Sequence, residues 1–170
     1  MTERYYTYTV SHCSEAIKYG LYWLINELDK YDSEKGCILA VGKGNFCNKS
    51  TKVYKEGLGE NIVKKLCKYG YTIINGKKIE FQYPRNIHTA SFNSVVVIYP
   101  YKKLINKIED TIAHYQHTDR PYLPPNAFPK SLLIIPWIEL GVDEWIEKFN
   151  PHRIDIECPD YYKYGSCRRL

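Results

Sequence analysis

A polar segment that contains two glycines and two lysines follows the short apolar run Cys37–Val41. Glycine lets backbone N–H groups approach an anion closely, and the lysine ammonium group is a phosphate ligand. We therefore predict that phosphate binds at Gly42, Lys43, Gly44, Asn45, Lys49 and Ser50.

Two phosphate-binding motifs are matched only in part by this segment. The run from Gly42 begins like G-x-G-x-x-G, but Cys47 stands at the third glycine position. Lys49 and Ser50 resemble the end of a Walker A loop, yet Lys43 and Asn48 stand at its two glycine positions. No known family is identified from these residues.

Aromatic residues follow two other apolar runs of the chain. Tyr99 and Tyr101 flank the proline after one run, and Trp137 follows the proline after the next. In parallel sheets ligands bind at the carboxyl ends of the strands, where flat rings suit a nucleobase or a nicotinamide. We predict that Tyr99, Tyr101 and Trp137 contact such a ring. The alternative is that they are packing residues at helix starts.

Histidines provide a separate set of chemical candidates. His88 precedes an apolar run and is a candidate general base, although no nucleophile is near it in sequence. The spacing of His114, His117 and Asp119 is compatible with metal ligands, and equally with a polar helix end. Cys47 lies among lysines, which lower the pKa of a neighbouring thiol.

The elements that position these residues follow from apolar periodicity. Three apolar runs, 38–41, 94–99 and 131–135, alternate with helical stripes, which predicts adjacent or near-adjacent parallel strands with helices on both faces. Asn75-Gly76 predicts a hairpin over 71–83, placed toward one edge. Residues 4–10 and 153–157 alternate as edge strands do. The fold class is α/β, a three-layer Rossmann-like domain with a mostly parallel sheet.

Length and charge set the domain organisation. The 170 residues suit one α/β domain, which we assign to 1–157, followed by a C-terminal tail over 158–170. The net charge is +5, and the segment Lys43–Lys68, with seven lysines and two glutamates, carries all of it. Either this segment is a solvated helix face or it is an electropositive rim. The tail interleaves tyrosines with cations, as binders of single-stranded nucleic acid do, but its lack of periodicity favours a disordered or docked segment.

Cysteine usage and hydropathy indicate the cellular compartment in which the protein is expected. Six cysteines include no CxxC pair, and no apolar run approaches membrane-spanning length. We expect a cytoplasmic protein with reduced thiols and no membrane partner, in which Cys37 and Cys67 are small core residues. The even number of cysteines also permits disulfides, but their spacing does not indicate any.

The leading functional prediction is the binding of a nucleotide or a related phosphate-bearing small molecule at the carboxyl ends of the parallel strands. Such a protein is a sensor, a sequestering protein or an enzyme. One alternative is a nucleic-acid or protein interaction module that uses the Lys43–Lys68 face and the tail. Another is a small hydrolase centred on His88 or on His114 and His117. Neither a cofactor nor an oligomeric state is assigned.

Overall fold

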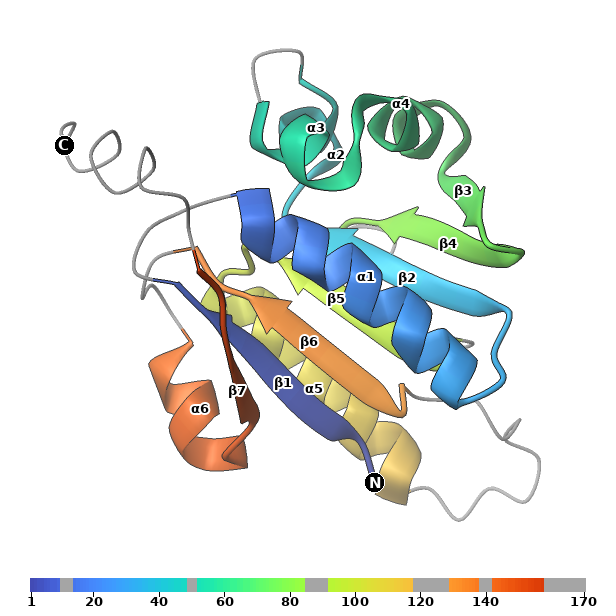
Figure 1. The fold of residues 1–170 in the computed structure, drawn as a ribbon. Helices are drawn as coiled ribbons and strands as arrows, with labels where there is room; N and C mark the ends of the chain where they lie inside the picture. The colour runs from blue at the N-terminus through green and yellow to red at the C-terminus, as the bar shows by residue number, and fades with distance from the viewer. Residues whose placement is uncertain (10–13, 49–51, 85–91, 118–128, 138–141, 158–170) are drawn as a thin grey trace, which may run out of the picture.

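A computed structural model describes residues 1–9, 14–48, 52–84, 92–117, 129–137 and 142–157. Its described strands form one seven-stranded sheet, flanked by helices on both faces (Figure 1). The strands are β1 (Glu3–Tyr8), β2 (Lys35–Ala40), β3 (Tyr71–Ile74), β4 (Lys77–Gln82), β5 (Ser94–Ile98), β6 (Ser131–Ile135) and β7 (His152–Asp155). The helices are α1 (Ser14–Lys30), α2 (Lys43–Cys47), α3 (Lys52–Leu58), α4 (Glu60–Tyr69), α5 (Lys102–His117) and α6 (Asp143–Phe149).

The three apolar runs form the centre of the sheet, as predicted. The strand order is β3-β4-β2-β5-β6-β1-β7, and β2, β5 and β6 are consecutive parallel neighbours. Only the β3–β4 pair is antiparallel among the described strands. The α/β class with a mostly parallel sheet is therefore confirmed.

The hairpin joining β3 to β4 turns at Asn75 and Gly76, and it forms one edge of the sheet. Both turn residues adopt positive φ, 49° and 75°, as a type I′ turn requires. The predicted hairpin and its place at an edge are confirmed.

The first strand does not lie where the sequence predicts it. We expected residues 4–10 at an edge, but β1 is inserted between β6 and β7, and β7 is the edge. The rings of Tyr5 and Tyr6 pack into different hydrophobic clusters, one on each side of the sheet. Because a hydrophobic cluster packs against each face of β1, the strand lies inside the sheet, and the apolar rings of its partly buried tyrosines suit this position.

Two hydrophobic clusters cover the two faces of the sheet. On the first face α1, α2, α3 and α4 pack over Val96 and Ile98 of β5, while on the second face α5 and α6 pack over Val97. All five residues of β6 are buried. Each fully buried aliphatic side chain contributes about 1.5–3 kcal/mol, so the central strands anchor both layers.

Helix α3 approaches α1 closely at Gly57. A Cβ atom at this position would lie 2.7 Å from Cβ of Ile17 and 2.9 Å from the carbonyl oxygen of Ser14. A Cβ atom at Gly44 of α2 meets nothing within 4 Å. An alanine substitution at each of these two helical glycines therefore distinguishes the effect of packing on stability from the effect of helix propensity.

We predict that Gly57→Ala lowers the free energy of unfolding by about 1–3 kcal/mol, because the added methyl overpacks the contact with α1. Gly44→Ala should leave stability unchanged or raise it by up to about 1 kcal/mol, since alanine favours helix. Urea denaturation of the two variants measures both values. A Gly57→Ala variant as stable as Gly44→Ala would contradict the close approach.

Candidate functional site

The carboxyl ends of β2 and β5 lie side by side at one edge of the sheet, which we call the carboxyl edge. The last register pair of the two strands is Ala40 with Ile98. The chain leaves β2 toward α2 on the first face and leaves β5 toward α5 on the second (Figure 1). Adjacent strands whose connections leave to opposite faces create a crevice at which α/β proteins bind ligands.

The glycine segment after β2 forms a short helix. Gly42 is extended, with φ of −169°, and α2 begins at Lys43. The amide of Phe46 donates to the carbonyl oxygen of Gly42 at 3.1 Å. Neither Gly42 nor Gly44 has positive φ, and a Cβ atom at either meets nothing within 4 Å. The fold does not demand glycine here, so the segment is open to an approaching group.

Tyr99 holds an uncommon backbone conformation at the end of β5. Its φ is 53°, in the left-handed region that bulky residues rarely adopt. Its amide donates to the carbonyl oxygen of Ile135 at 2.8 Å. Its ring meets that of Trp137 edge to face, with centroids 4.9 Å apart and an interplanar angle of 87°. Since Trp137 is 45% exposed, the structure brings together two of the three aromatic residues proposed from the sequence, with one ring open to solvent.

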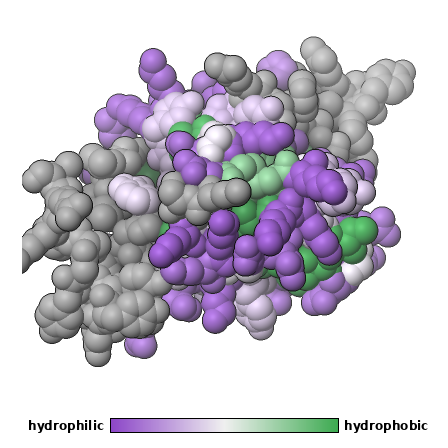
Figure 2. All heavy atoms as spheres, turned by 90° about the horizontal axis from the view of Figure 1, so that it is seen from above, coloured by the Kyte–Doolittle hydropathy of each residue, from purple (hydrophilic) through white to green (hydrophobic). Residues whose placement is uncertain are grey.

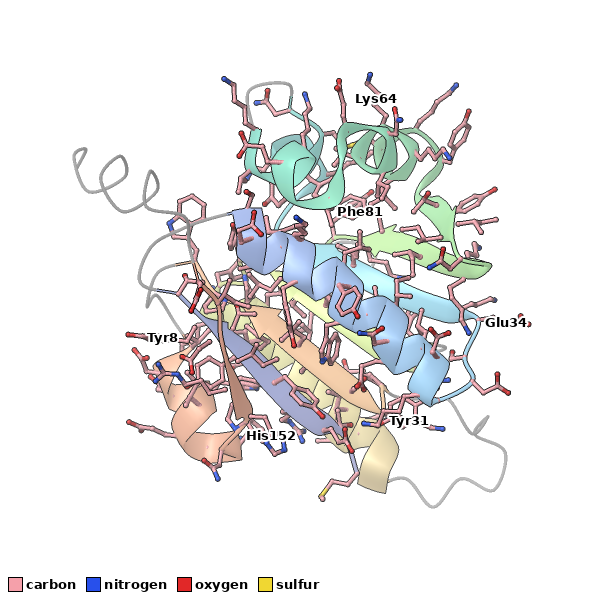
Figure 3. All side chains as sticks on the ribbon, in the orientation of Figure 1. Tyr8, Tyr31, Glu34, Lys64, Phe81 and His152 are labelled. Atoms are coloured by element: carbon pink, nitrogen blue, oxygen red, sulfur yellow. A yellow bond between two sulfur atoms is a disulfide. The ribbon has the colours of Figure 1, made fainter. Side chains whose placement is uncertain are left out.

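A chain of aromatic rings connects this pair to the helices of the first face. The ring of Tyr54 in α3 lies 6.0 Å from Tyr99 and 4.8 Å from Phe46 in α2. Phe46 stacks on Phe81 of β4 at 4.2 Å, and Phe81 lies between the sheet and the helices above it (Figure 3). Sequence reasoning missed this chain because its rings come from separate elements.

Burial keeps the two phenols of this chain protonated. It raises the pKa of Tyr54 to about 12 and raises that of Tyr99 well above its ordinary value. At neutral pH both side chains are therefore neutral rings, suited to packing and stacking rather than to proton abstraction.

The N-terminus of α5 adds cations to the carboxyl edge. The carbonyl oxygen of Tyr101 accepts from the amides of Leu104 and Ile105, at 2.9 and 3.2 Å, and the ring of Tyr101 is 43% exposed. Lys102 and Lys103 occupy the first turn, which contains no acidic residue. Lys102 pairs with Glu144 at 2.7 Å. The signal for these lysines, two cations directly after a strand end, was present in the sequence and was overlooked.

Several sequence-predicted residues fall outside the described residues. They are Lys49, Ser50, His88 and Asp119, together with the side chain of His117. His114 is exposed on α5. No group of three or more metal-ligating side chains forms among the residues that the structure describes. The structure therefore brings Lys43 and Asn45 to the edge that Tyr99, Tyr101 and Trp137 share, and leaves the histidine predictions untested.

Cys47 and Cys67 form a disulfide between α2 and α4, which corrects the expectation that Cys67 is a reduced core residue. Their Cα atoms lie 5.7 Å apart, within the usual range for a disulfide. The residues are 20 positions apart, and the packing of α2 against α4 brings them together. Cys47 is thus not the free thiol that its lysine neighbours suggested. Cys37 is buried and free, and burial raises its pKa. A cytoplasmic location stays a prediction.

Lysines from α2, α3 and α4 gather on the outer surface of these helices, which we call the basic face. Hydrophilic side chains cover most of this surface (Figure 2), and Lys64 points away from the sheet (Figure 3). The exposed lysines on it are Lys43, Lys52, Lys64, Lys65 and Lys68. Lys64 pairs with Glu60 at 3.1 Å, and an exposed pair of this kind contributes little to stability.

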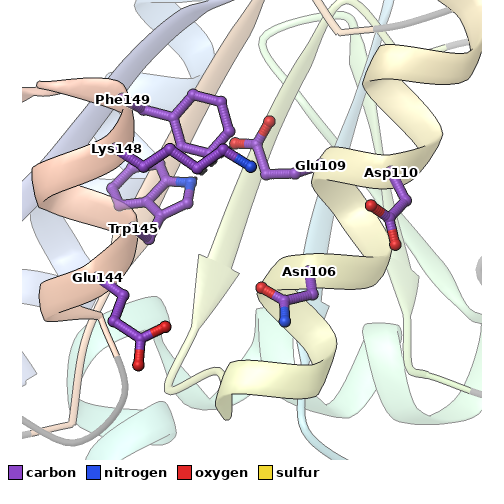
Figure 4. A pocket seen from close by; sticks show the side chains of 7 residues that line it. All are labelled: Asn106, Glu109, Asp110, Glu144, Trp145, Lys148 and Phe149. Carbon is purple, nitrogen blue, oxygen red and sulfur yellow. Dashed lines mark hydrogen bonds between the residues drawn. The ribbon is translucent and has the colours of Figure 1, made fainter.

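A cavity of about 340 Å³ lies between α5 and α6 (Figure 4). Its buried carboxylate, Glu109, accepts from Arg4 at 2.9 and 2.7 Å and from the indole N–H of Trp145 at 2.7 Å. The guanidinium of Arg4 also lies over the ring of Phe149, 4.4 Å from its centroid. Because Glu109 is already bonded on both oxygens, we interpret this network as a structural link between β1, α5 and α6.

The chain matches no protein-family model, no curated protein and no solved structure. Fold and geometry alone therefore support a functional proposal. None of the helices in the described part of the chain is both long and apolar enough to span a bilayer.

We predict that Glu109→Ala lowers the free energy of unfolding by about 3–5 kcal/mol, because it leaves the Arg4 charge buried without its partner. The matched control is Glu144→Ala, which breaks the exposed pair with Lys102 and should cost less than about 1 kcal/mol. Urea denaturation distinguishes the two. Equal losses would show that the Arg4–Glu109 pair does not link these elements.

Proposed function

We propose that the carboxyl edge between β2 and β5 binds a nucleotide or a related phosphate-bearing small molecule. The sheet would then serve in the Rossmann-like manner, with the ligand in the crevice where connections leave to opposite faces. The strand order differs from the common 3-2-1-4-5-6 arrangement, since β1 lies between β6 and β7. The proposal therefore rests on the edge itself rather than on a fold family.

The conformation of Tyr99 is the observation that carries the proposal. A left-handed conformation costs a non-glycine residue of order 1–2 kcal/mol, and strained residues of this kind cluster at ligand sites. The strain directs the chain so that the Tyr99 ring supports Trp137, whose own ring is half exposed. A solvent-exposed indole braced by a buried phenol is a suitable surface for stacking a base.

Cations around this surface suit the phosphate. Lys43 extends from the first turn of α2, and Lys102 and Lys103 extend from the first turn of α5. The N-terminus of a helix as long as α5, which has 16 residues, favours an anion. In this arrangement the base stacks on Trp137 while the phosphate lies toward Gly42–Asn45 and the start of α5.

We predict that Trp137→Ala weakens nucleotide binding by about 1–3 kcal/mol, because it removes the stacking surface. Its stability should fall far less than the roughly 3–5 kcal/mol that a buried tryptophan would cost, since Trp137 is 45% exposed. Gly44→Val should abolish binding by placing a branched side chain in the open segment. Calorimetric titration with nucleotides, NAD and cyclic nucleotides measures the affinities, and thermal melts measure stability.

Tryptophan fluorescence provides a second readout of the same site. Trp23 and Trp145 are buried, so quenching of the native protein by acrylamide reports mainly on Trp137. A bound ligand should protect this indole from the quencher. If no ligand of the panel shifts the wild-type melt or changes the quenching, the proposal is wrong.

The basic face favours nucleic-acid binding as a second candidate function. Its lysines come from three helices on one side of the molecule and extend into solvent (Figure 2). Such a surface attracts a phosphate backbone without reading sequence.

If the basic face binds duplex DNA, affinity should fall steeply with salt, with a slope of about −0.9 in log K against log salt per phosphate contact. Lys65→Ala should reduce that slope by about 1 if Lys65 contacts a phosphate. Lys148→Ala on α6, on the second face, is the matched control and should change nothing. Fluorescence anisotropy with a labelled duplex measures both, and absence of binding at low salt would show that these lysines form only a solvated face.

A further inference from the structure

We propose that the outer edge of β3 binds an extended, acidic segment of a partner protein by β-strand addition. β3 is the terminal strand at one end of the sheet, and it pairs only with β4 among the described strands. This edge lies apart from the carboxyl edge, so the proposal is independent of nucleotide binding.

The hydrogen-bonding pattern of the hairpin directs two residues of β3 outward. A two-residue turn makes Ile74 and Lys77 a hydrogen-bonded pair, and such pairs alternate along an antiparallel ladder. The amide of Phe81 donates to the carbonyl oxygen of Gly70 at 2.8 Å. This pair lies four positions along the ladder from Ile74 and Lys77, where the alternation again requires a hydrogen-bonded pair. The N–H and C=O groups of Tyr71 and Ile73 therefore point away from β4, toward the open edge.

The side chains of the same two residues are exposed and largely apolar. Ile73 is 62% exposed and Tyr71 is 42% exposed, whereas Thr72 between them is buried. Figure 2 shows hydrophobic surface at the side of the molecule where β3 lies. An added strand would gain backbone hydrogen bonds and apolar contacts at the same residues, the combination by which strand addition gives affinity and specificity.

The surrounding charge selects an acidic partner. Lys68 lies over the ring of Tyr69, with its ammonium 4.9 Å from the centroid. Lys78 lies over the ring of Tyr71 at 4.8 Å, but its ammonium is already paired with Glu80 at 2.8 Å, so the preference for an acidic partner depends on the lysines of α4. Neither Lys65 nor Lys68 forms an ion pair in the described part of the chain. Glutamate or aspartate flanking the added strand would meet these cations, while a second copy of β3 would bring like charges together. Lysines also prevent edge strands from pairing with strands of other molecules, so the alternative is that no partner strand pairs with β3.

Proline substitution tests the pairing with little disturbance of the fold. Ile73→Pro removes an N–H that points outward, and proline is tolerated at such edge positions. Thr72→Pro is the contrasting variant, because it removes an N–H of the β3–β4 ladder and should destabilise the hairpin. Ile73→Lys keeps the backbone donor and removes the apolar side chain.

The experiment is selection of a displayed library of random twelve-residue peptides against the full chain, followed by titration of an enriched synthetic peptide. We expect enrichment of acidic sequences with apolar residues at alternate positions. Ile73→Pro should weaken the peptide at least about tenfold, with a melting temperature close to that of the wild type. Lys65→Glu/Lys68→Glu should weaken it about tenfold as well, through charge reversal.

Four results would overturn the proposal. If the enriched peptides contain no acidic residues, the proposal of an acidic partner is wrong. Equal binding to the wild type and to Ile73→Pro would place the peptide elsewhere, and failure to enrich any peptide would show that the lysines simply protect the edge. Binding of a single-stranded RNA that Tyr71→Ala abolishes and Ile73→Pro does not would make this a stacking site instead.

Discussion

Burial of the central strands on both faces is the constraint from which the remaining architecture follows. The side chains of β2, β5 and β6 alternate between two hydrophobic clusters, so neither face of the sheet can be left to water. Helices must then cover both faces, so some connections between strands lie on the first face and others on the second. Because β2 leads to the first face and β5 to the second, the carboxyl edge between them has the arrangement at which α/β proteins bind ligands.

The conformation of Tyr99 shows how the same core supports strain at that edge. A left-handed tyrosine persists only where its surroundings offset a cost of order 1–2 kcal/mol. Here its amide is bonded to Ile135 of β6, and its ring packs against Tyr54 and Trp137. The aromatic chain continues through Phe46, so α2 and α3 both stabilise the strand end. The exposed ring of Trp137 therefore rests on a tyrosine that is itself held by the packing beneath it.

The elements that could be predicted are those whose signal is local. Three apolar runs and an Asn-Gly turn specify β2, β5, β6 and the hairpin without reference to distant residues. The place of β1 depends on which strand it pairs with, and its register with β6 joins Tyr5 to Leu133, far away in sequence. No periodicity within residues 3–8 encodes that choice. The disulfide was missed for the same reason, since it depends on how α2 packs against α4.

The candidate site likewise combines features that the sequence predicts with features that depend on packing between distant residues. That Tyr99 and Trp137 share one edge follows from their positions after parallel strands, and their ring contact agrees with that reasoning. The conformation of the glycine segment was not predictable, because Gly42 and Gly44 permit many backbone conformations and require none, and helix α2 forms there. This helix places Lys43 at the carboxyl edge, while the disulfide at its other end joins it to α4 of the basic face. The two proposed anion-binding surfaces are thus connected through one short, cross-linked helix, so phosphate bound at Lys43 would reduce the positive charge available to a partner on the basic face.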